Sequence, residues 1–106
     1  MPLFERCWSK LGLTDDDLRA AELMVMVEPD RHPVIQKTGG VRKFRFTGAH
    51  WPQGKRGAAR VYYLYVPDKG IVIWLWCHRK NEEDGLTEKG KEQMRALIEE
   101  TLRCFE

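Results

Sequence analysis

Two runs of β-branched and aromatic residues near the middle of this 106-residue chain constrain its fold more than any other feature. The runs read ARVYYLYV, from Ala59 to Val66, and IVIWLWC, from Ile71 to Cys77. Such residues favour strands, and the PDKG segment between the runs has the proline and glycine typical of a tight turn. The pattern predicts an antiparallel hairpin. Because both runs are almost continuously apolar, we expect both strands to lie in the middle of a sheet, with helices covering part of their area.

A third strand is predicted from the alternation in VRKFRF, residues 41–46. Successive side chains of a strand point to opposite faces, so Val41, Lys43 and Arg45 share one face. Arg42 and the two phenylalanines share the other. The following segment, TGAHWPQGKRGA, contains three glycines and a proline and is expected to form a loop.

Two helices are predicted before this strand and one after the hairpin. Thr14 can cap a helix over residues 15–28, which Pro29 ends, and a shorter helix precedes it and stops at Gly12. Thr87 can cap the C-terminal helix. The apolar residues of the three helices recur at helical spacing: Phe4, Trp8 and Leu11; Leu18, Ala21 and Val25; Met94, Leu97, Ile98 and Leu102. This order of elements predicts one α+β domain over residues 1–106, with an antiparallel sheet of three to four strands.

The charges of the chain are unevenly distributed. The net charge is only +2, but the window from Arg31 to Pro67 holds no Asp or Glu, although the chain has 16 acids. The cations of this window are Arg31, Lys37, Arg42, Lys43, Arg45, Lys55, Arg56 and Arg60, and it also holds His32 and His50. A solubilising surface usually mixes both signs, so the window predicts a face that binds an anion, with nucleic acid the leading candidate.

Several classes of protein are not expected. No stretch approaches the roughly 18 apolar residues of a membrane span, and the N-terminus MPLFERCWSK lacks the order of a signal peptide, so we expect a cytoplasmic protein without a membrane partner. Cys7, Cys77 and Cys104 have neither the number nor the spacing of a disulfide framework or zinc site, and we expect reduced, buried thiols. Nucleotide-binding and metalloprotease motifs are missing from the sequence, so no cofactor or metal is expected.

The cations of the predicted sheet are the best candidates for chemistry. If the two apolar runs form a hairpin, antiparallel pairing makes Arg60 a neighbour of the segment from His78 to Lys80. Whether these side chains share a face with Lys43 and Arg45 depends on the register. Such a cluster would suit metal-free cleavage of RNA, in which the ribose 2′-hydroxyl is the nucleophile. Arginine would stabilise the charged transition state, and His78 or a lysine would transfer protons. The alternative for His78 is a hydrogen-bonded residue at a strand end, and for Lys43 and Arg45 it is a solvated outer face.

Three segments resemble the RelE-type toxins of bacterial type II toxin-antitoxin systems, especially the HigB-like branch. They are VIQKTGGVRKFRF, GKRGAARVYYLYV and HRKNEEDGLTEKGKEQMRALIE, which occur in the family's order and span about Pro33 to Leu102. The resemblance implies a compact antiparallel sheet flanked by helices. It also implies a ribosome-dependent, metal-independent endoribonuclease that cuts mRNA and is held inactive by an antitoxin, here expected to be a helix-turn-helix protein of the HigA type.

The resemblance also implies roles for individual residues. Arg60 takes the position that contacts the scissile phosphate, Lys43 and Arg45 form the first strand's basic pair, and Lys80 is the basic group before the final helix. Together with His78, these are the expected catalytic residues. The resemblance implies that Lys55 and Arg56 lie in the loop that meets mRNA or ribosomal RNA, and that Arg79 can join Lys80 as the basic group. Apart from the resemblance, RNA contacts are also expected from Lys37, Arg42 and Arg79.

The chain departs from the family's pattern in three places. His78 stands where the branch often has tyrosine, GKRGA replaces GKRGG in a lengthened loop, and no strand is predicted before the first helix, which would leave a sheet edge for a partner to cover. Two other functions stay open. One is a non-catalytic RNA- or ribosome-binding module, or a decayed toxin. The other is the gyrase-poisoning ParE-like branch, against which the catalytic cations count.

Overall fold

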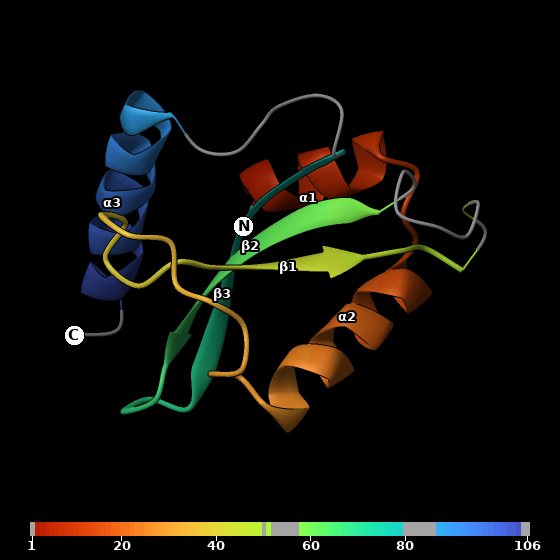
Figure 1. Ribbon diagram of the computed structural model, residues 1–106, viewed down its shortest axis with the longest axis horizontal. Coiled ribbons are helices and arrows are strands. Elements are labelled where there is room, and N and C mark those ends of the chain that lie inside the picture. The colour runs from red at the N-terminus through yellow and green to blue at the C-terminus, as the bar shows by residue number, and fades with distance from the viewer. Residues whose placement is uncertain (1, 50, 52–57, 80–86, 105–106) are drawn as a thin grey trace.

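The computed structural model describes residues 2–49, 51, 58–79 and 87–104, and its elements follow the predicted order (Figure 1). Helices α1 (Pro2–Lys10) and α2 (Asp15–Val27) come first. Strands β1 (Arg42–Phe46), β2 (Ala59–Val66) and β3 (Ile71–Arg79) follow, and α3 (Glu88–Arg103) comes last. The fold is α+β, with a three-stranded antiparallel sheet flanked by two N-terminal helices and one C-terminal helix. The predicted fold class is confirmed.

The sheet has the order β1-β2-β3, so β2 is central and β3 is an edge strand of the described sheet. The prediction that both apolar runs lie in the middle of the sheet is therefore correct for β2 and wrong for β3. The apolar character of β3 has another cause. Helices pack on both of its faces, since its alternate residues belong to the two separate cores of the molecule.

A β-bulge interrupts the pairing of β2 with β3. Tyr62 pairs with Trp76 and Tyr63 pairs with Trp74, which leaves Leu75 as an extra residue on β3. Trp74, which precedes the bulge, shares a face of the sheet with Tyr63. Trp76 and His78, which follow the bulge, lie on the opposite face with Tyr62. The bulge therefore decides which face His78 occupies.

One face of the sheet is covered by α1 and α2. Phe4 and Trp8 of α1 and Ala21 and Val25 of α2 are at most 4% exposed and belong to one core with Phe44. Gly12 ends α1 as predicted, with φ at +76°, a conformation in which glycine avoids a side-chain clash. The predicted cap of α2 is also confirmed.

That cap is reciprocal and ties α2 to a distant loop. The Thr14 hydroxyl accepts a hydrogen bond from the Asp17 amide at 3.1 Å, and Asp17 Oδ2 accepts one from the Thr14 amide at 3.0 Å. Asp17 Oδ1 accepts a third from the amide of Ala49 at 3.0 Å. Asp17 thus holds the chain beyond β1 against the start of α2.

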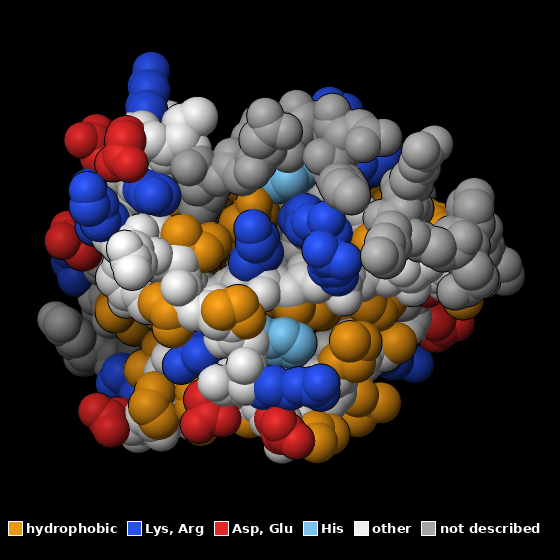
Figure 2. Space-filling model, viewed as in Figure 1, with side chains coloured by type: hydrophobic (Ala, Val, Ile, Leu, Met, Phe, Trp, Pro, Cys, Tyr) orange, Lys and Arg blue, Asp and Glu red, His pale blue; other side chains and the backbone are white. Residues whose placement is uncertain are grey.

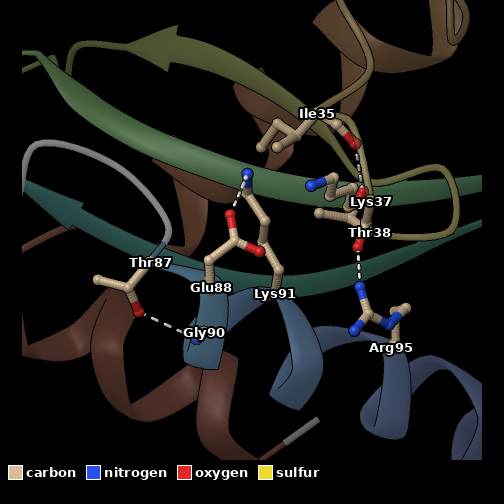
Figure 3. Close-up of polar contacts among 8 residues, drawn as sticks. All are labelled: Ile35, Lys37, Thr38, Thr87, Glu88, Gly90, Lys91 and Arg95. Atoms are coloured by element: carbon tan, nitrogen blue, oxygen red, sulfur yellow. Dashed lines mark hydrogen bonds and ion pairs between the residues drawn. The ribbon is translucent and has the colours of Figure 1, made fainter.

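The other face of the sheet packs against α3. Met94 and Ile98 are buried with Val41, Leu64 and Leu75, as the spacing of the apolar residues predicted. Thr87 caps the helix by accepting a hydrogen bond from the Gly90 amide at 3.0 Å (Figure 3).

A turn before β1 fixes α3 to the sheet. The buried Thr38 hydroxyl donates to the Ile35 carbonyl at 2.6 Å and accepts from the Val41 amide at 3.0 Å. Arg95 of α3 donates to the carbonyl of Lys37 in the same turn (Figure 3). The side chain of Lys91 extends from α3 toward the strands in this view.

Among the residues that the structure describes, no helix has the length and apolar character needed to cross a membrane. Cys7, Cys77 and Cys104 all lie in the described part of the chain, and none of them is in a disulfide. The prediction that the thiols are buried holds only for Cys77, because Cys7 is half-buried and Cys104 is exposed.

Candidate nucleic-acid interface

The register of the sheet aligns three predicted catalytic residues in one row. Arg45 pairs with Arg60, and Arg60 pairs with His78. Cross-strand partners point to the same face and have their Cβ atoms about 5 Å apart. Lys43 precedes Arg45 by two residues and therefore lies on this face as well. The question that the sequence left open is thus settled: these four side chains share one face.

We call Lys43, Arg45 and Arg60 the cationic surface. It lies on the α3 side of the sheet, toward the end that begins with Arg60, while α3 covers the half that contains Leu64. Figure 2 shows lysine and arginine side chains gathered over β1 and β2 at the centre of this face, beside α3. Within the described ranges, no carboxylate forms an ion pair with any of the three cations.

Arg60 has an unsatisfied buried nitrogen. Its Nη1 atom is buried and has no hydrogen-bond partner among the described residues. Burial lowers the pKa of the Arg60 guanidinium, and the positive charge of Arg45 lowers it further. A buried donor without an acceptor is costly, and the cost is greater when the group is charged. The Nη1 atom of Arg60 therefore lacks an acceptor that a bound anion could supply.

His78 lies behind this surface rather than on it. Its side chain is 3% exposed, Nδ1 is 2.7 Å from the Arg79 carbonyl oxygen, and Nε2 is 2.8 Å from the hydroxyl of Tyr62. A carbonyl oxygen can only accept, so Nδ1 carries a hydrogen and donates it to Arg79. The imidazole also stacks on Tyr62 and contacts Trp76. This is the hydrogen-bonded strand-end histidine that was the alternative to a catalytic one.

Two residues of this face were not predicted from the sequence. Tyr62 stands two residues after Arg60 on the same face, and its hydroxyl is hydrogen-bonded to the buried His78 ring. Lys91 of α3 precedes Met94 by three residues and Ile98 by seven, so it extends the helical stripe that faces the sheet. Its side chain is 19% exposed and lies 3.6 Å from the Glu88 carboxylate. The two-residue period of a strand places Tyr62 on the face of Arg60, and helical spacing places Lys91 on the side of Met94. The sequence could therefore have identified both residues.

Arg42 and Arg79 lie on the opposite face of the sheet and do not join the cationic surface. Arg42 donates to the carbonyls of Asp30 and His32 at 2.9 and 2.6 Å. The Arg79 guanidinium lies 4.3 Å from the ring centroid of Trp51 and 3.4 Å from the Leu11 carbonyl oxygen. Both cations therefore have internal partners.

The remaining predicted residues are less informative. Lys37 lies in the turn before β1, with φ at +67°, and its carbonyl holds Arg95. Lys55, Arg56 and Lys80 fall outside the described residues. Within the described ranges, no cluster of three or more His, Cys, Asp or Glu side chains could hold a metal ion.

The arrangement offers the positive charge and the hydrogen-bond donors that an anion such as phosphate requires. Two guanidinium groups on adjacent strands are positioned by a hydrogen-bonded ladder, and arginine pairs with phosphate oxygens in a bidentate way. Lys43 adds a third cation and exchangeable protons on the same face. No protein-family model matches the chain.

Proposed function

We propose that this protein is an endoribonuclease that cleaves mRNA on the ribosome without a metal ion, as the toxin of a type II toxin-antitoxin system. The observation that carries the proposal is the position of Arg60. Its partly buried guanidinium has an unsatisfied nitrogen and lies directly opposite Arg45. A scissile phosphate would supply the missing acceptor. The resemblance of the three sequence segments to RelE-type toxins supports the same reading.

The proposed reaction uses the substrate's own nucleophile. The ribose 2′-oxygen attacks the adjacent phosphorus, the bond to the 5′-oxygen breaks, and the products end in a 2′,3′-cyclic phosphate and a 5′-hydroxyl. Arg60 and Arg45 stabilise the extra negative charge of the transition state, an effect that can be worth several kcal/mol when the donors are preorganised. Their place on paired strands provides that preorganisation.

Two protons move in this reaction. The 2′-hydroxyl loses one to solvent, and the departing 5′-oxygen gains one. Lys43 is only partly buried and lies on the same face as Arg60, so we assign the second transfer to it. His78 is buried behind Tyr62 and would act by holding the Tyr62 hydroxyl in place.

The test is primer extension on cellular mRNA after the protein is induced. We expect growth arrest and new cleavage sites within translated mRNA for the wild type, and neither for Arg60→Ala. Arg19→Ala is the matched control, because Arg19 has a 79% exposed side chain on α2 and, among the described residues, forms an ion pair only with the exposed Asp16. Absence of cleavage by the wild type in a translating extract would refute the proposal.

A non-catalytic RNA-binding module is the second candidate, and the burial of His78 favours it. Such a module would bind RNA through the cationic surface without cutting it. Three phosphate contacts to a single strand predict that the logarithm of affinity falls with the logarithm of salt with a slope of about −2. Binding with this slope, together with intact mRNA, would support the module over the nuclease.

The proposal also implies a partner and a compartment. A nuclease that acts on translating ribosomes works in the cytoplasm, and a host that carries it needs an inhibitor. We expect an adjacent gene for a small helix-turn-helix antitoxin, and co-expression of that gene should restore growth. A solitary gene would favour the RNA-binding module.

A further inference from the structure

The outer side of α2 exposes a group of large apolar side chains. Of the six large apolar side chains that are exposed in the described part of the chain, four lie between Leu23 and Val27, with exposed fractions of 46–77%. Ala21 and Val25 belong to the same helix but are fully buried in the core. The second half of α2 is therefore apolar on both sides, and Figure 2 shows apolar side chains at the surface over this part of the helix.

These exposed residues have the spacing of a helix-binding stripe. Leu23 follows the exposed Ala20 by three residues, and Met26 and Val27 follow Leu23 by three and four residues. Residues at these spacings are neighbours on a helix surface, so the four side chains form one stripe along about two turns of α2. A second helix that packs beside α2 would contact positions with this spacing. We call Ala20, Leu23, Met26 and Val27 the outer stripe.

The charges around the outer stripe are mostly negative. The segment from Asp15 to Asp30 contains six acids and a single base, Arg19. Arg19 lies 3.8 Å from the carboxylate of Asp16, so its charge is already compensated within the helix. Three of the other acids form no ion pair in the described part of the chain, namely Glu22, Glu28 and Asp30. Such a surface attracts a partner that carries cations beside its own apolar residues.

We propose that the outer stripe binds a basic amphipathic helix of a partner protein. The apolar residues of that helix would cover the outer stripe, and its lysines or arginines would face the carboxylates around it. Charge disfavours the other occupants. A second copy of this chain, docked through the same stripe, would bring two acidic segments together. The anionic lipids of a membrane surface would be repelled in the same way.

A helix bound to the outer stripe would leave the cationic surface uncovered. The core side of α2 packs on the face of the sheet that carries Phe44 and Phe46. Lys43 and Arg45 alternate with these phenylalanines along β1 and lie on the opposite face, as does Arg60. The partner helix and an RNA strand could therefore bind at the same time. Binding to α2 does not require the proposed nuclease activity, because it can be measured without RNA.

The experiment uses the full chain and two labelled synthetic peptides. The first peptide has about 14 residues, roughly four helical turns, with leucine on one side of the helix and lysine on the other. The second has glutamate in place of every lysine. By fluorescence anisotropy at low salt, we expect the lysine peptide to bind more tightly than the glutamate peptide, and added salt to weaken its binding. No binding of the lysine peptide, or equal binding of both peptides, would overturn the proposal.

Variants of the outer stripe test where the peptide binds. The double variant Leu23→Gln with Met26→Gln should bind the lysine peptide at least about tenfold more weakly, because two apolar side chains are lost. Both residues are exposed, so the fold should tolerate the change. Leu3→Gln is the matched control, since Leu3 is an exposed apolar residue on α1. An equal loss in the control would refute binding at α2.

Charge variants and the oligomeric state complete the test. Glu22→Gln with Glu28→Gln should weaken binding of the lysine peptide and reduce its salt dependence, whereas Glu92→Gln with Glu99→Gln on α3 should change neither. The same salt dependence in both double variants would refute the role of the α2 carboxylates. Without peptide, sedimentation velocity should show a monomer. A dimer that dissociates when the outer stripe is substituted would assign α2 to a second copy of the chain and overturn the proposal.

Discussion

Replacing Arg60 with methionine should stabilise the fold while it removes RNA binding. The guanidinium Nη1 of Arg60 is buried without a hydrogen-bond partner in the described structure. Leaving a buried polar group unsatisfied costs about 1–3 kcal/mol. Arg60 as a whole is only partly buried, so we expect a gain near the lower end, about 1–2 kcal/mol. Methionine keeps most of the length of the side chain and needs no acceptor.

Arg45→Met is the matched control for this prediction. Either substitution removes the repulsion between Arg45 and Arg60, which lie opposite each other, so the difference between the variants isolates the buried nitrogen. Arg45 is exposed, and its replacement should change the free energy of unfolding by less than about 0.5 kcal/mol.

Urea unfolding followed by tryptophan fluorescence measures this difference, since the chain has four tryptophans. In a domain of this size, each kcal/mol also shifts Tm by roughly 4–8 °C, which thermal unfolding can verify. RNA binding by Arg60→Met should be lost in parallel. If Arg60→Met unfolds more easily than Arg45→Met and still binds RNA, Arg60 supports the fold and the reasoning is wrong.

Three other predictions concern the surrounding structure. Asp17→Ala should lower the free energy of unfolding by about 2–3 kcal/mol, because it removes acceptors for the amides of Thr14 and Ala49; equal stability in urea would contradict this. Thr38→Val should cost about 1–3 kcal/mol, because it removes a buried hydroxyl that makes two backbone hydrogen bonds, and unchanged stability would show that the turn does not need them. Burial lowers the pKa of His32 below 6.5, so the unfolded chain takes up the proton first as pH falls. Stability should therefore be full above about pH 6.5 and decline below it, and His32→Gln should flatten the decline; an unchanged pH profile would refute this.

The sequence predicted the elements of this fold well because each carried a local signal. Alternation in VRKFRF placed Lys43 and Arg45 on one face, and the caps at Thr14 and Thr87 follow from the side-chain chemistry of threonine. The edge position of β3 could not be predicted in the same way. A run of apolar residues indicates that both faces of a strand are buried, but not whether the strand lies inside the sheet or at its edge. In β3 helices bury both faces.

The candidate site was only partly predictable. The hairpin implied that Arg60 and His78 would be neighbours, but whether they share a face depends on the bulge at Leu75, for which alternation gives no sign. The partners of Arg79 could not be predicted either, because the Leu11 carbonyl and the Trp51 ring come from remote parts of the chain. Tertiary contacts decided both outcomes.

The bulge also affects which changes in chain length the sheet can accept. β3 holds one residue more than its partner over the paired length, and the extra residue is Leu75. Deleting it would leave a regular ladder in which Trp74 and Trp76 keep their present faces. The pairing is regular on either side of Leu75, so the bulge separates the hairpin end of the sheet from its cationic end. An insertion or deletion tested at this one position should cost core packing while leaving the alignment of Arg45, Arg60 and His78 intact.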